Sequence, residues 1–447
     1  MTKTKSNNQN HDDRRWACPG LFRMPASADG GICRIKLEQG QVDATQLRAL
    51  AKLVDGFGDG LLEVTTRANV QIRGVTADNS ASLSQKLVMA GFGPKIKNGD
   101  DVRNIMVNPT AGFDPLALRD IRPFAQELSL YVQTHYQNLS PKFSFLIDGG
   151  ESCAVLDHKS DIWLSLCDEG QNFAFGVASC PTTSTSRTQA LGKIVFEQGH
   201  QLIYALIDLL FERQKYAPQL QRMKHLQEAI SNEDIIAYLK SRQLDIYPAD
   251  HFIRNSKTSH YLGIYASLKA DHYYLGVKPP LARLTPLMLN LLANIVDEYT
   301  QGQGLIFTPW QSIIFANCSL KQANDINNIL AEQGFIVDIN DVRGKIIACA
   351  GAPKCAKALS NTLLDAENLA SLLLPDDLDN VHLTGCPKSC AATKAYPTTF
   401  VAIDNGLYDI YSSALAPKEQ GFGTLIGHKL NLKQAAKLIN RKALPII

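Results

Sequence analysis

Apolar and polar residues alternate in two stretches near the N-terminus, with a helical pattern between them. In residues 31–37, GICRIKL, Cys33, Ile35 and Leu37 share one face, which predicts a half-buried strand. Residues 43–58 carry apolar residues at helical spacing, with Asp43 or Thr45 as the N-cap. Residues 60–75, GLLEVTTRANVQIRGV, alternate throughout and predict one long strand.

The same order of elements returns at residues 274–318. There, a strand is followed by a helix that starts at a threonine, then a Gly-x-Gly-Leu turn and another strand. We align GDGLLEVTTR with GQGLIFTPWQ, which places Gln311 where the first copy has Arg67. Unrelated α/β units can share this order, but a true repeat predicts a pseudo-twofold protein with its site between the halves.

The rest of the chain indicates mixed α/β structure. Residues 141–150, PKFSFLIDGG, read as a strand with Lys142, Ser144 and Asp148 on one side, and residues 161–168 read as a second strand. A helical region at 195–240 is divided by a proline. The last segment, 341–447, carries a group of cysteines and ends in strand-like and helical stretches.

Composition narrows the class of protein. The chain has 447 residues, 45% hydrophobic and 20% charged, which is typical of a globular protein of several domains. A net charge of +2 gives no support to a nucleic-acid partner. No stretch approaches the about 18 apolar residues of a membrane span, and residues 1–16 lack a signal-peptide core, so we expect a cytoplasmic protein.

Four of the ten cysteines fall in one short window. Their spacing is Cys349-x5-Cys355, then thirty residues, then Cys386-x3-Cys390, among Gly, Pro and Lys. In a reducing compartment clustered cysteines favour metal binding or catalysis. Four thiolates suit a [4Fe–4S] cluster, whereas structural zinc prefers shorter gaps, and buried inert thiols are the third alternative. The other six are expected to be structural, with the role of Cys18 left open.

A basic face is the second candidate site. The fork of arginine suits carboxylates, and the polar faces of the predicted strands carry several basic residues beside Thr, Asn and Gln. This pattern predicts a pocket for a polycarboxylate next to a redox cluster. Its candidate residues are Arg34, Lys36, Arg67, Asn69, Arg73, Arg103 and Lys142.

Several features together resemble those of the nitrite/sulfite reductase superfamily. They are the repeat, the stretches TTRANVQIRG, DVRNIMVNP and PKFSF, and the cysteine spacing. This resemblance covers about residues 14–412. It implies an α+β fold of duplicated ferredoxin-like half-domains and two larger nitrite/sulfite-reductase-type α/β domains with pseudo-twofold symmetry. It also implies a [4Fe–4S] cluster on Cys349, Cys355, Cys386 and Cys390, whose last cysteine bridges to siroheme, a tetrapyrrole with eight carboxylates. The expected domains are 14–95, 96–250, 251–335 and 336–447.

Within the superfamily RRWACPGLFRMP, FTPWQS and ACAGAPKCAKAL are similar to the precorrin-3B synthase branch. That branch implies O₂-dependent hydroxylation of precorrin-3A with lactone formation in aerobic cobalamin biosynthesis. It implies NADH as reductant, an electron-donor protein or NADH-linked reductase as partner, and no nucleic-acid or membrane partner. A further iron, or siroheme in place of precorrin, stays open.

The resemblance assigns catalysis to Lys142 and Arg103, and tetrapyrrole contacts to Arg34, Lys36, Arg67, Asn69 and Arg73. One position departs from the reductases. These commonly carry two lysines two residues apart, and here the second is Ser144. A siroheme sulfite or nitrite reductase is therefore the alternative function, because it would need more positive charge at the site.

Overall fold

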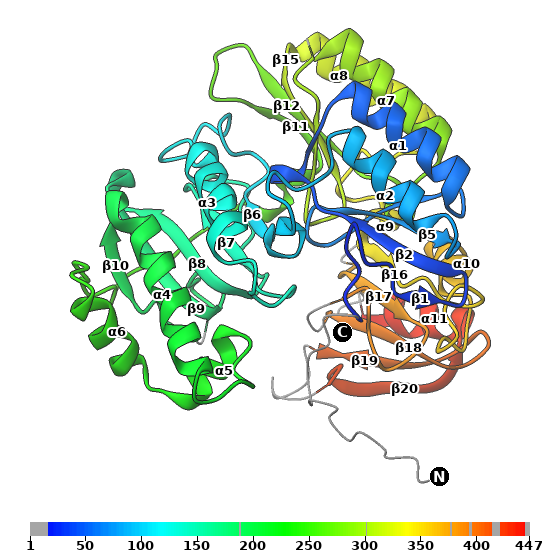
Figure 1. Ribbon diagram of the computed structural model, residues 1–447. Coiled ribbons are helices and arrows are strands. Elements are labelled where there is room, and N and C mark those ends of the chain that lie inside the picture. Colours follow the sequence, from blue (N-terminus) through cyan, green and yellow to red (C-terminus); the bar gives the residue numbers. More distant parts are fainter. Residues whose placement is uncertain are drawn as a thin grey trace, which may run out of the picture.

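The computed structural model describes residues 17–186, 189–300, 302–375, 378–392, 396–413 and 421–442. These residues form four five-stranded sheets, which Figure 1 shows in three groups. The two ferredoxin-like sheets lie together, one mixed sheet with its helices lies to one side, and the second mixed sheet lies below them. The mixed α+β class and the duplicated half-domains are thus confirmed.

The two ferredoxin-like sheets have matching strand orders, β1–β2–β5–β4–β13 and β11–β12–β15–β14–β3. Each half lends one short strand to the other, because β13 pairs with β4 and β3 pairs with β14. The bounds are β1 Ala26–Ser27, β2 Gly30–Ile35, β3 Gln41–Val42, β4 Leu62–Val64, β5 Val70–Val75, β11 Gly263–Ala266, β12 Tyr273–Val277, β13 Arg283–Leu284, β14 Leu305–Phe307 and β15 Ile313–Cys318. This exchange ties the two copies into one unit.

The stretch 60–75 is a hairpin, and the prediction of one long strand is wrong. Leu62 pairs with Ile72 and Val64 with Val70, so the chain reverses at Thr65–Asn69. The Thr65 N–H donates to the Asn69 carbonyl (2.8 Å), and Ala68 takes a positive φ of 55°. Strict alternation survives on both arms, which is why the pattern imitated a continuous strand.

The second copy reverses in the same way, and this corrects the alignment of the repeats. The Thr308 N–H donates to the Ser312 carbonyl (3.0 Å), and Gln311 takes a φ of 63°. Gln311 therefore corresponds to Ala68, and Trp310 stands where the first copy has Arg67. The two halves therefore differ at the turn that carries Arg67.

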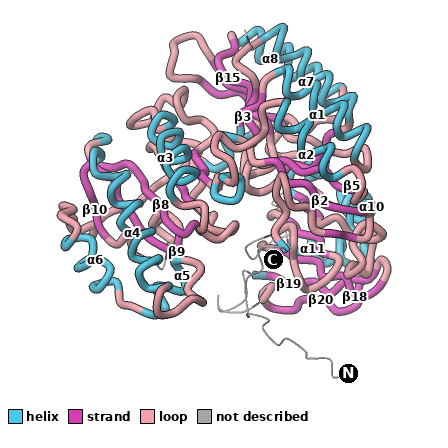
Figure 2. Tube along the Cα trace, in the orientation of Figure 1, coloured by secondary structure: helices cyan, strands magenta, loops and turns pink. Residues whose placement is uncertain are grey.

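Helices cover one side of this double unit, as Figures 1 and 2 show for α1, α2, α7 and α8. Asp43 caps α1 with a full capping box and Thr285 caps α7, so both predicted N-caps are confirmed. The apolar faces of α1 and α7 pack into a single core with both sheets. The bounds are α1 Ala44–Phe57, α2 Ser80–Met89, α7 Pro286–Tyr299 and α8 Leu320–Glu332.

The third sheet, β10–β9–β8–β7–β6, is mixed, with β6, β7 and β8 parallel. One face buries Phe145, Ile162 and Leu164 under the helices. The opposite face carries Leu146 and Trp163. The bounds are β6 Ile105–Val107, β7 Phe145–Asp148, β8 Ser160–Cys167, β9 Asn172–Ser179, β10 Gly192–Val195, α3 Arg122–His135, α4 Gly199–Gln214, α5 Met223–Ala229 and α6 Asn232–Ser241.

The fourth sheet, β16–β17–β18–β19–β20, begins with the parallel pair β16 and β17. Helices α10 and α11 pack against it over Leu369, Phe400 and Ile439. The bounds are α9 Val342–Lys345, β16 Ile346–Ala348, α10 Thr362–Ala370, β17 Val381–Thr384, β18 Thr398–Asp404, β19 Leu407–Ser412, β20 Thr424–Asn431 and α11 Leu432–Lys442. Among the helices of the described ranges, none has the length and apolar character needed to cross a bilayer.

Candidate functional site

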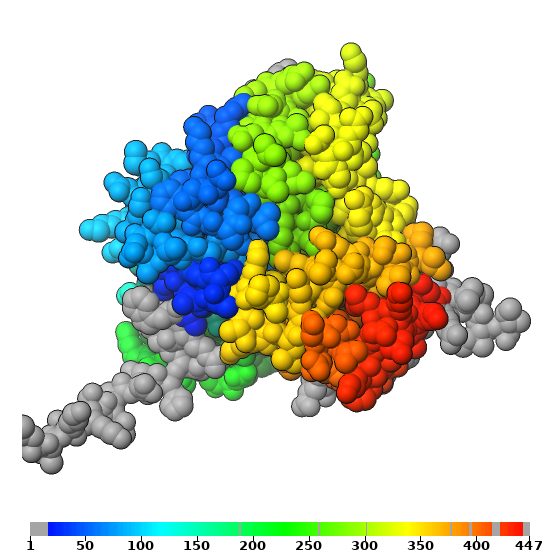
Figure 3. Space-filling view, turned by 90° about the vertical axis from the view of Figure 1, so that its right-hand side faces the viewer, coloured from blue at the N-terminus to red at the C-terminus, as the bar shows by residue number. Residues whose placement is uncertain are grey.

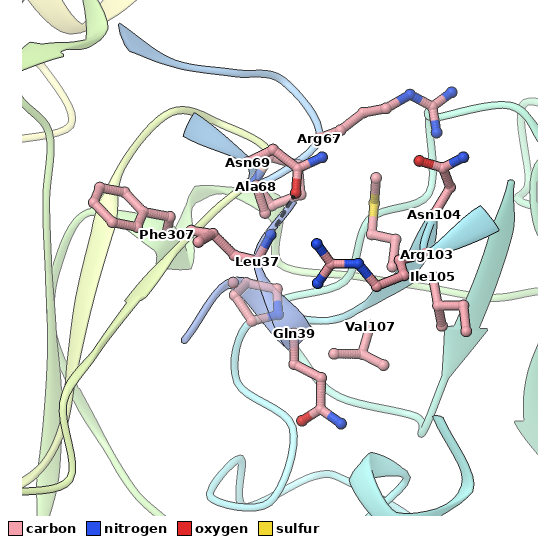
Figure 4. A pocket seen from close by; sticks show the side chains of 14 residues that line it. Leu37, Gln39, Arg67, Ala68, Asn69, Arg103, Asn104, Ile105, Val107 and Phe307 are labelled. Atoms are coloured by element: carbon pink, nitrogen blue, oxygen red, sulfur yellow. Dashed lines mark hydrogen bonds between the residues drawn. The ribbon is translucent and has the colours of Figure 1, made fainter. Parts of the chain in front are cut away.

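A small pocket, partly open to solvent, lies where three separate parts of the chain meet. The segment after β2 and the turn of the first hairpin form one wall, β6 forms another, and the second hairpin closes it (Figure 4). A site between the halves was predicted, and contributions from both hairpins agree with it. The lining residues are Leu37, Gln39, Gly40, Arg67, Ala68, Asn69, Arg103, Asn104, Ile105, Met106, Val107, Pro109, Phe307 and Pro309.

Arg67 stands at the tip of the first hairpin. Its guanidinium has no hydrogen-bond partner among the described residues and extends away from Arg103, past the amide of Asn104 (Figure 4). Burial lowers the pKa of Arg67, and the nearby charge of Arg222 lowers it further while Asp161 opposes this. A partly buried cation with no internal partner is well suited to bind an anionic ligand.

Asn69 and Arg34 support the hairpin. The Asn69 side-chain oxygen accepts a hydrogen bond from the Leu37 N–H (3.0 Å), so it holds the pocket wall in place. Arg34 donates to the amide oxygen of Gln71 (3.0 Å), and its buried Nε has no partner in the described part of the chain. Burial lowers the pKa of Arg34, and the neighbouring Cys18 raises it.

Lys36 and Arg103 are both held by the short turn at Gly99–Val102. The Lys36 amine donates to the carbonyls of Asp100 (2.6 Å) and Asp101 (2.9 Å), and burial lowers its pKa to about 8. Arg103 lines the pocket, but its guanidinium donates to the Asp100 carboxylate (2.8 Å) and the Phe92 carbonyl (3.0 Å). The structure thus uses Lys36 and most of Arg103 within the protein.

Arg73 links the first half to the cysteine segment. It forms an ion pair with Asp29 (2.9 Å) and donates to the Lys354 carbonyl (3.3 Å), next to Cys355. Lys354 also forms an ion pair with Asp59 (2.5 Å). Figure 3 shows the yellow and orange surface after residue 340 against the blue surface of the first half. Arg73 therefore holds the cysteine segment in position.

The cysteine pairs converge at one edge of the fourth sheet. Because β16 and β17 are parallel neighbours, Cys349 and Cys386 follow their adjacent carboxyl ends. The Gly385 N–H donates to the Cys349 sulfur (3.2 Å), and a Cβ on Gly385 would lie 2.6 Å from the Cβ of Ala358. A glycine is needed there to bring the loops together, and its N–H···S bond is of the kind that tunes iron–sulfur clusters.

The other three clustered thiols lie within electrostatic range of Cys390. Burial raises the pKa of Cys390, and Cys386, Cys349 and Cys355 raise it further, against Lys388. Within the described residues, no three His, Cys, Asp or Glu side chains are grouped so that they could hold a single metal ion. Sulfurs around one tetrahedral zinc would lie about 3.8 Å apart. A four-iron cluster binds each thiolate through a different iron, so its four thiolates do not meet at one ion.

Lys142 and Ser144 precede β7. The strand occupies only Phe145–Asp148, so the predicted strand over 141–150 is too long. Lys142 lies in an exposed turn, and Ser144 is 1% exposed with a hydroxyl that has no partner among the described residues. Asn104, which sequence reasoning missed, donates to the carbonyls of Pro141 (2.9 Å) and Phe143 (2.9 Å) and fixes this segment beside Arg67.

Behind the pocket wall, β6 and β7 end in a buried group of acids. Asn108 donates to Asp148 (2.7 Å) and to Glu151 (2.7 Å), and Arg254 forms an ion pair with Asp148 (2.7 Å). Burial first and the Asp148 charge second raise the pKa of Glu151 to about 8. Glu151 is therefore largely protonated at neutral pH, and its Oε1 has no hydrogen-bond partner among the described residues.

We expect Glu151→Gln to flatten the pH dependence of stability. Between pH 4.5 and pH 8 the unfolded chain releases a proton that the native Glu151 retains, so wild-type stability falls as pH rises. Proton retention by Glu151 changes the free energy of unfolding by up to about 1.4 kcal/mol per pH unit in that window. Urea unfolding at pH 5.5 and pH 8 should show a larger decrease for the wild type than for Glu151→Gln, and equal decreases would contradict the assignment.

Two family descriptions match the chain. "Nitrite/Sulfite reductase ferredoxin-like half domain" matches residues 26–90 and again residues 266–333, which confirms the predicted repeat. "Nitrite and sulphite reductase 4Fe-4S domain" matches residues 98–244. The match of the second description covers β6 to β10 and ends before the four clustered cysteines.

Curated relatives match over most of the chain. A precorrin-3B synthase of Sinorhizobium sp is 29% identical over 398 residues, 88% of this chain and 82% of the relative. A chloroplastic ferredoxin–nitrite reductase of Oryza sativa is 26% identical, over 86% of this chain and 68% of the relative. The structure of Mycobacterium tuberculosis NirA is similar in fold, with a TM-score of 0.72, 18% identity and coverage of 92% of this chain and 80% of NirA.

The two half-domain matches, the third match between them and the NirA-like fold are all consistent with one architecture. An iron–sulfur oxidoreductase of nitrite/sulfite reductase type is the class that they support. The chain belongs to the nitrite/sulfite reductase superfamily.

Proposed function

We propose that this protein is a precorrin-3B synthase, which hydroxylates precorrin-3A with O₂ and forms the lactone of precorrin-3B. The observation that carries the proposal is that the candidate cations next to Arg67 are held by partners within the described residues. Arg103 is paired with Asp100, and Lys36 is bound to carbonyls. Ser144 stands where the reductases that the chain resembles commonly carry a second lysine. Reduction of sulfite or nitrite requires strong stabilisation of a small anion, and this pocket is poorly equipped for it. The precorrin-3B synthase of Sinorhizobium sp, 29% identical, also supports this proposal.

Cys349, Cys355, Cys386 and Cys390 would hold the [4Fe–4S] cluster, since two loops bring four thiols to one sheet edge next to the first half. When bound, the cluster supplies single-electron transfer, and a further iron or siroheme supplies the metal centre that ground-state O₂ requires. Arg73 and Lys354 position this segment against the half-domain through the Asp29 and Asp59 ion pairs.

The remaining residues bind and orient the substrate. Arg67 would bind a peripheral carboxylate and so select which carbon faces the oxidant. One oxygen atom enters the macrocycle and the other leaves as water, which consumes two electrons from an NADH-linked donor and two protons. Lys142, exposed in the turn before β7, would deliver protons from solvent, and Arg103 would hold a second part of the macrocycle.

We expect the purified protein to convert precorrin-3A to a product heavier by one oxygen atom, which carries one ¹⁸O when the reaction is run under ¹⁸O₂. Mass spectrometry of the product checks this result. The control is the same protein with sulfite or nitrite and a reduced viologen, for which we expect little turnover. Conversely, sulfite or nitrite reduction without precorrin hydroxylation would replace the proposal by the reductase alternative. The similar ferredoxin–nitrite reductases of Oryza sativa and Synechococcus elongatus are the relatives that support this alternative.

A further inference from the structure

A second arginine lies near Arg67 and comes from a part of the chain that showed no functional pattern. Arg222 immediately precedes α5 and is paired with the buried carboxylate of Asp161 (2.7 Å). The charges of Arg222 and Asp161 both act on the guanidinium of Arg67. Asp161 is paired with Arg222, and Arg67 lies beside Asn104, which donates to the Phe143 carbonyl next to Ser144. The Ser144 N–H in turn donates to Asp161 (2.9 Å), so hydrogen bonds link the surroundings of the two guanidinium groups.

Asp161 holds Arg222 in a fixed orientation. Its carboxylate accepts from the Arg222 Nε (2.7 and 2.8 Å) and also from the backbone N–H groups of Met223 (3.0 Å) and Ser144 (2.9 Å). Asp161 is 2% exposed, so it is locked between β7, β8 and α5. The Nη1 of Arg222 has no hydrogen-bond partner in the described part of the chain. It is free to bind a ligand.

A second independent observation comes from Ser144. Its N–H and carbonyl bond to Asp161, and its buried hydroxyl has no partner among the described residues. By the alternation of β7, Ser144 shares a face with Leu146 and Asp148, the face opposite the helices. Buried hydroxyls are almost always bonded, so the unpartnered hydroxyl of Ser144, whose backbone bonds to Asp161, is a position that a ligand oxygen would satisfy.

We propose that Arg222 and Arg67 together bind one peripheral carboxylate of the tetrapyrrole, with Asp161 as the residue that positions Arg222. This inference rests on the proposed function for its ligand class. It adds a specificity-determining residue from the helical segment after β10 to a pocket otherwise formed by the half-domains and β6. Arginine in a fixed orientation discriminates a planar carboxylate from other groups by its bidentate geometry.

The test measures binding without turnover. Uroporphyrin III, a stable tetrapyrrole with eight carboxylates, is titrated into the cluster-containing protein, and its absorption shift gives the dissociation constant. We expect Arg222→Gln to weaken binding by about tenfold, as for the loss of a hydrogen bond to a charged group. Arg222→Lys should restore part of the affinity. The double variant Arg67→Gln/Arg222→Gln should lose less than the product of the two single losses, because both residues bind the same carboxylate.

Arg242→Gln is the matched control, since Arg242 lies in the same helical segment but follows α6 and pairs with Asp208 of α4 (3.7 Å), whereas Arg222 precedes α5 and pairs with Asp161 of β8. It should bind the porphyrin as the wild type does. Unchanged affinity of Arg222→Gln, or a double variant with fully multiplied losses, would overturn the inference. If Arg222→Gln does not fold because Asp161 is left unpaired, Arg222→Gln/Asp161→Asn gives the same comparison. A failed precorrin assay with a positive porphyrin result would reject the proposed function alone, because siroheme also carries eight carboxylates.

Discussion

Replacing Cys390 with serine is expected to remove the iron–sulfur cluster and to reduce turnover to background. Cys390 is exposed in the described structure and lies within electrostatic range of the other three thiols. A cubane cluster is held almost entirely by thiolates, and serine offers a harder, more basic oxygen at a shorter reach. Iron and acid-labile sulfide per chain, together with the EPR spectrum of the reduced protein, measure the loss.

Cys167→Ser is the matched control for this experiment. Cys167 is half-buried at the end of β8, where its sulfur contacts the Asp168 carboxylate and the Asn172 carbonyl, both of which accept from a serine hydroxyl as well. It should keep its iron, sulfide and activity. Normal iron and sulfide in Cys390→Ser would remove Cys390 from the ligand set, and the same loss in Cys167→Ser would point to a general effect on folding.

Much of the fold could be predicted because periodic burial dominates these elements. The repeated order of strand, helix and strand, the caps at Asp43 and Thr285, and the break of the helical region by proline all depend on neighbours in sequence. The reversal at Thr65–Asn69 was missed for the same reason. Ala68 takes the positive φ where glycine or asparagine would have marked the turn.

The candidate site was predicted less completely because its chemistry depends on contacts between distant segments. Arg67 was found by its place in a polar pattern, and the cysteines by their spacing. The partners that decide whether a cation is free cannot be seen in the sequence: Lys36 is bound by carbonyls 64 and 65 residues away. Arg222 and Asp161 are brought together across 61 residues, and no local pattern marks either of them.

We expect Arg254→Gln to destabilise the protein more than any single change on its surface. Arg254 lies on the segment between the third sheet and the second half, and it pairs with Asp148, which is fully buried. It also donates to the carbonyl of Glu151, and its own N–H donates to the Thr182 carbonyl (2.7 Å). Removing it leaves Asp148 beside Glu151 without a counter-ion. Breaking a buried pair from one side costs about 3–5 kcal/mol.

The stability lost in Arg254→Gln should also depend on pH. Arg254 now keeps the pKa of Asp148 below its usual value against the effect of burial. Without Arg254 that pKa rises above its unfolded value, and stability then falls as pH increases from about 4. Urea unfolding should therefore show a smaller difference between wild type and Arg254→Gln at pH 5 than at pH 8. Asp148→Asn/Arg254→Gln should recover part of the loss, because it leaves no unpaired charge at that position.

Arg48→Gln supplies the comparison at the surface. Arg48 joins α1 to α7 through Asp297 (2.7 Å), and the two side chains are 39% and 54% exposed. Exposed pairs contribute about 0–1 kcal/mol, so this variant should unfold near the wild-type midpoint. If Arg254→Gln lowered the free energy of unfolding no more than Arg48→Gln does, the buried acids Asp148 and Glu151 would be hydrated rather than sealed from solvent. The raised pKa of Glu151 would then lose its cause, since burial is its largest source.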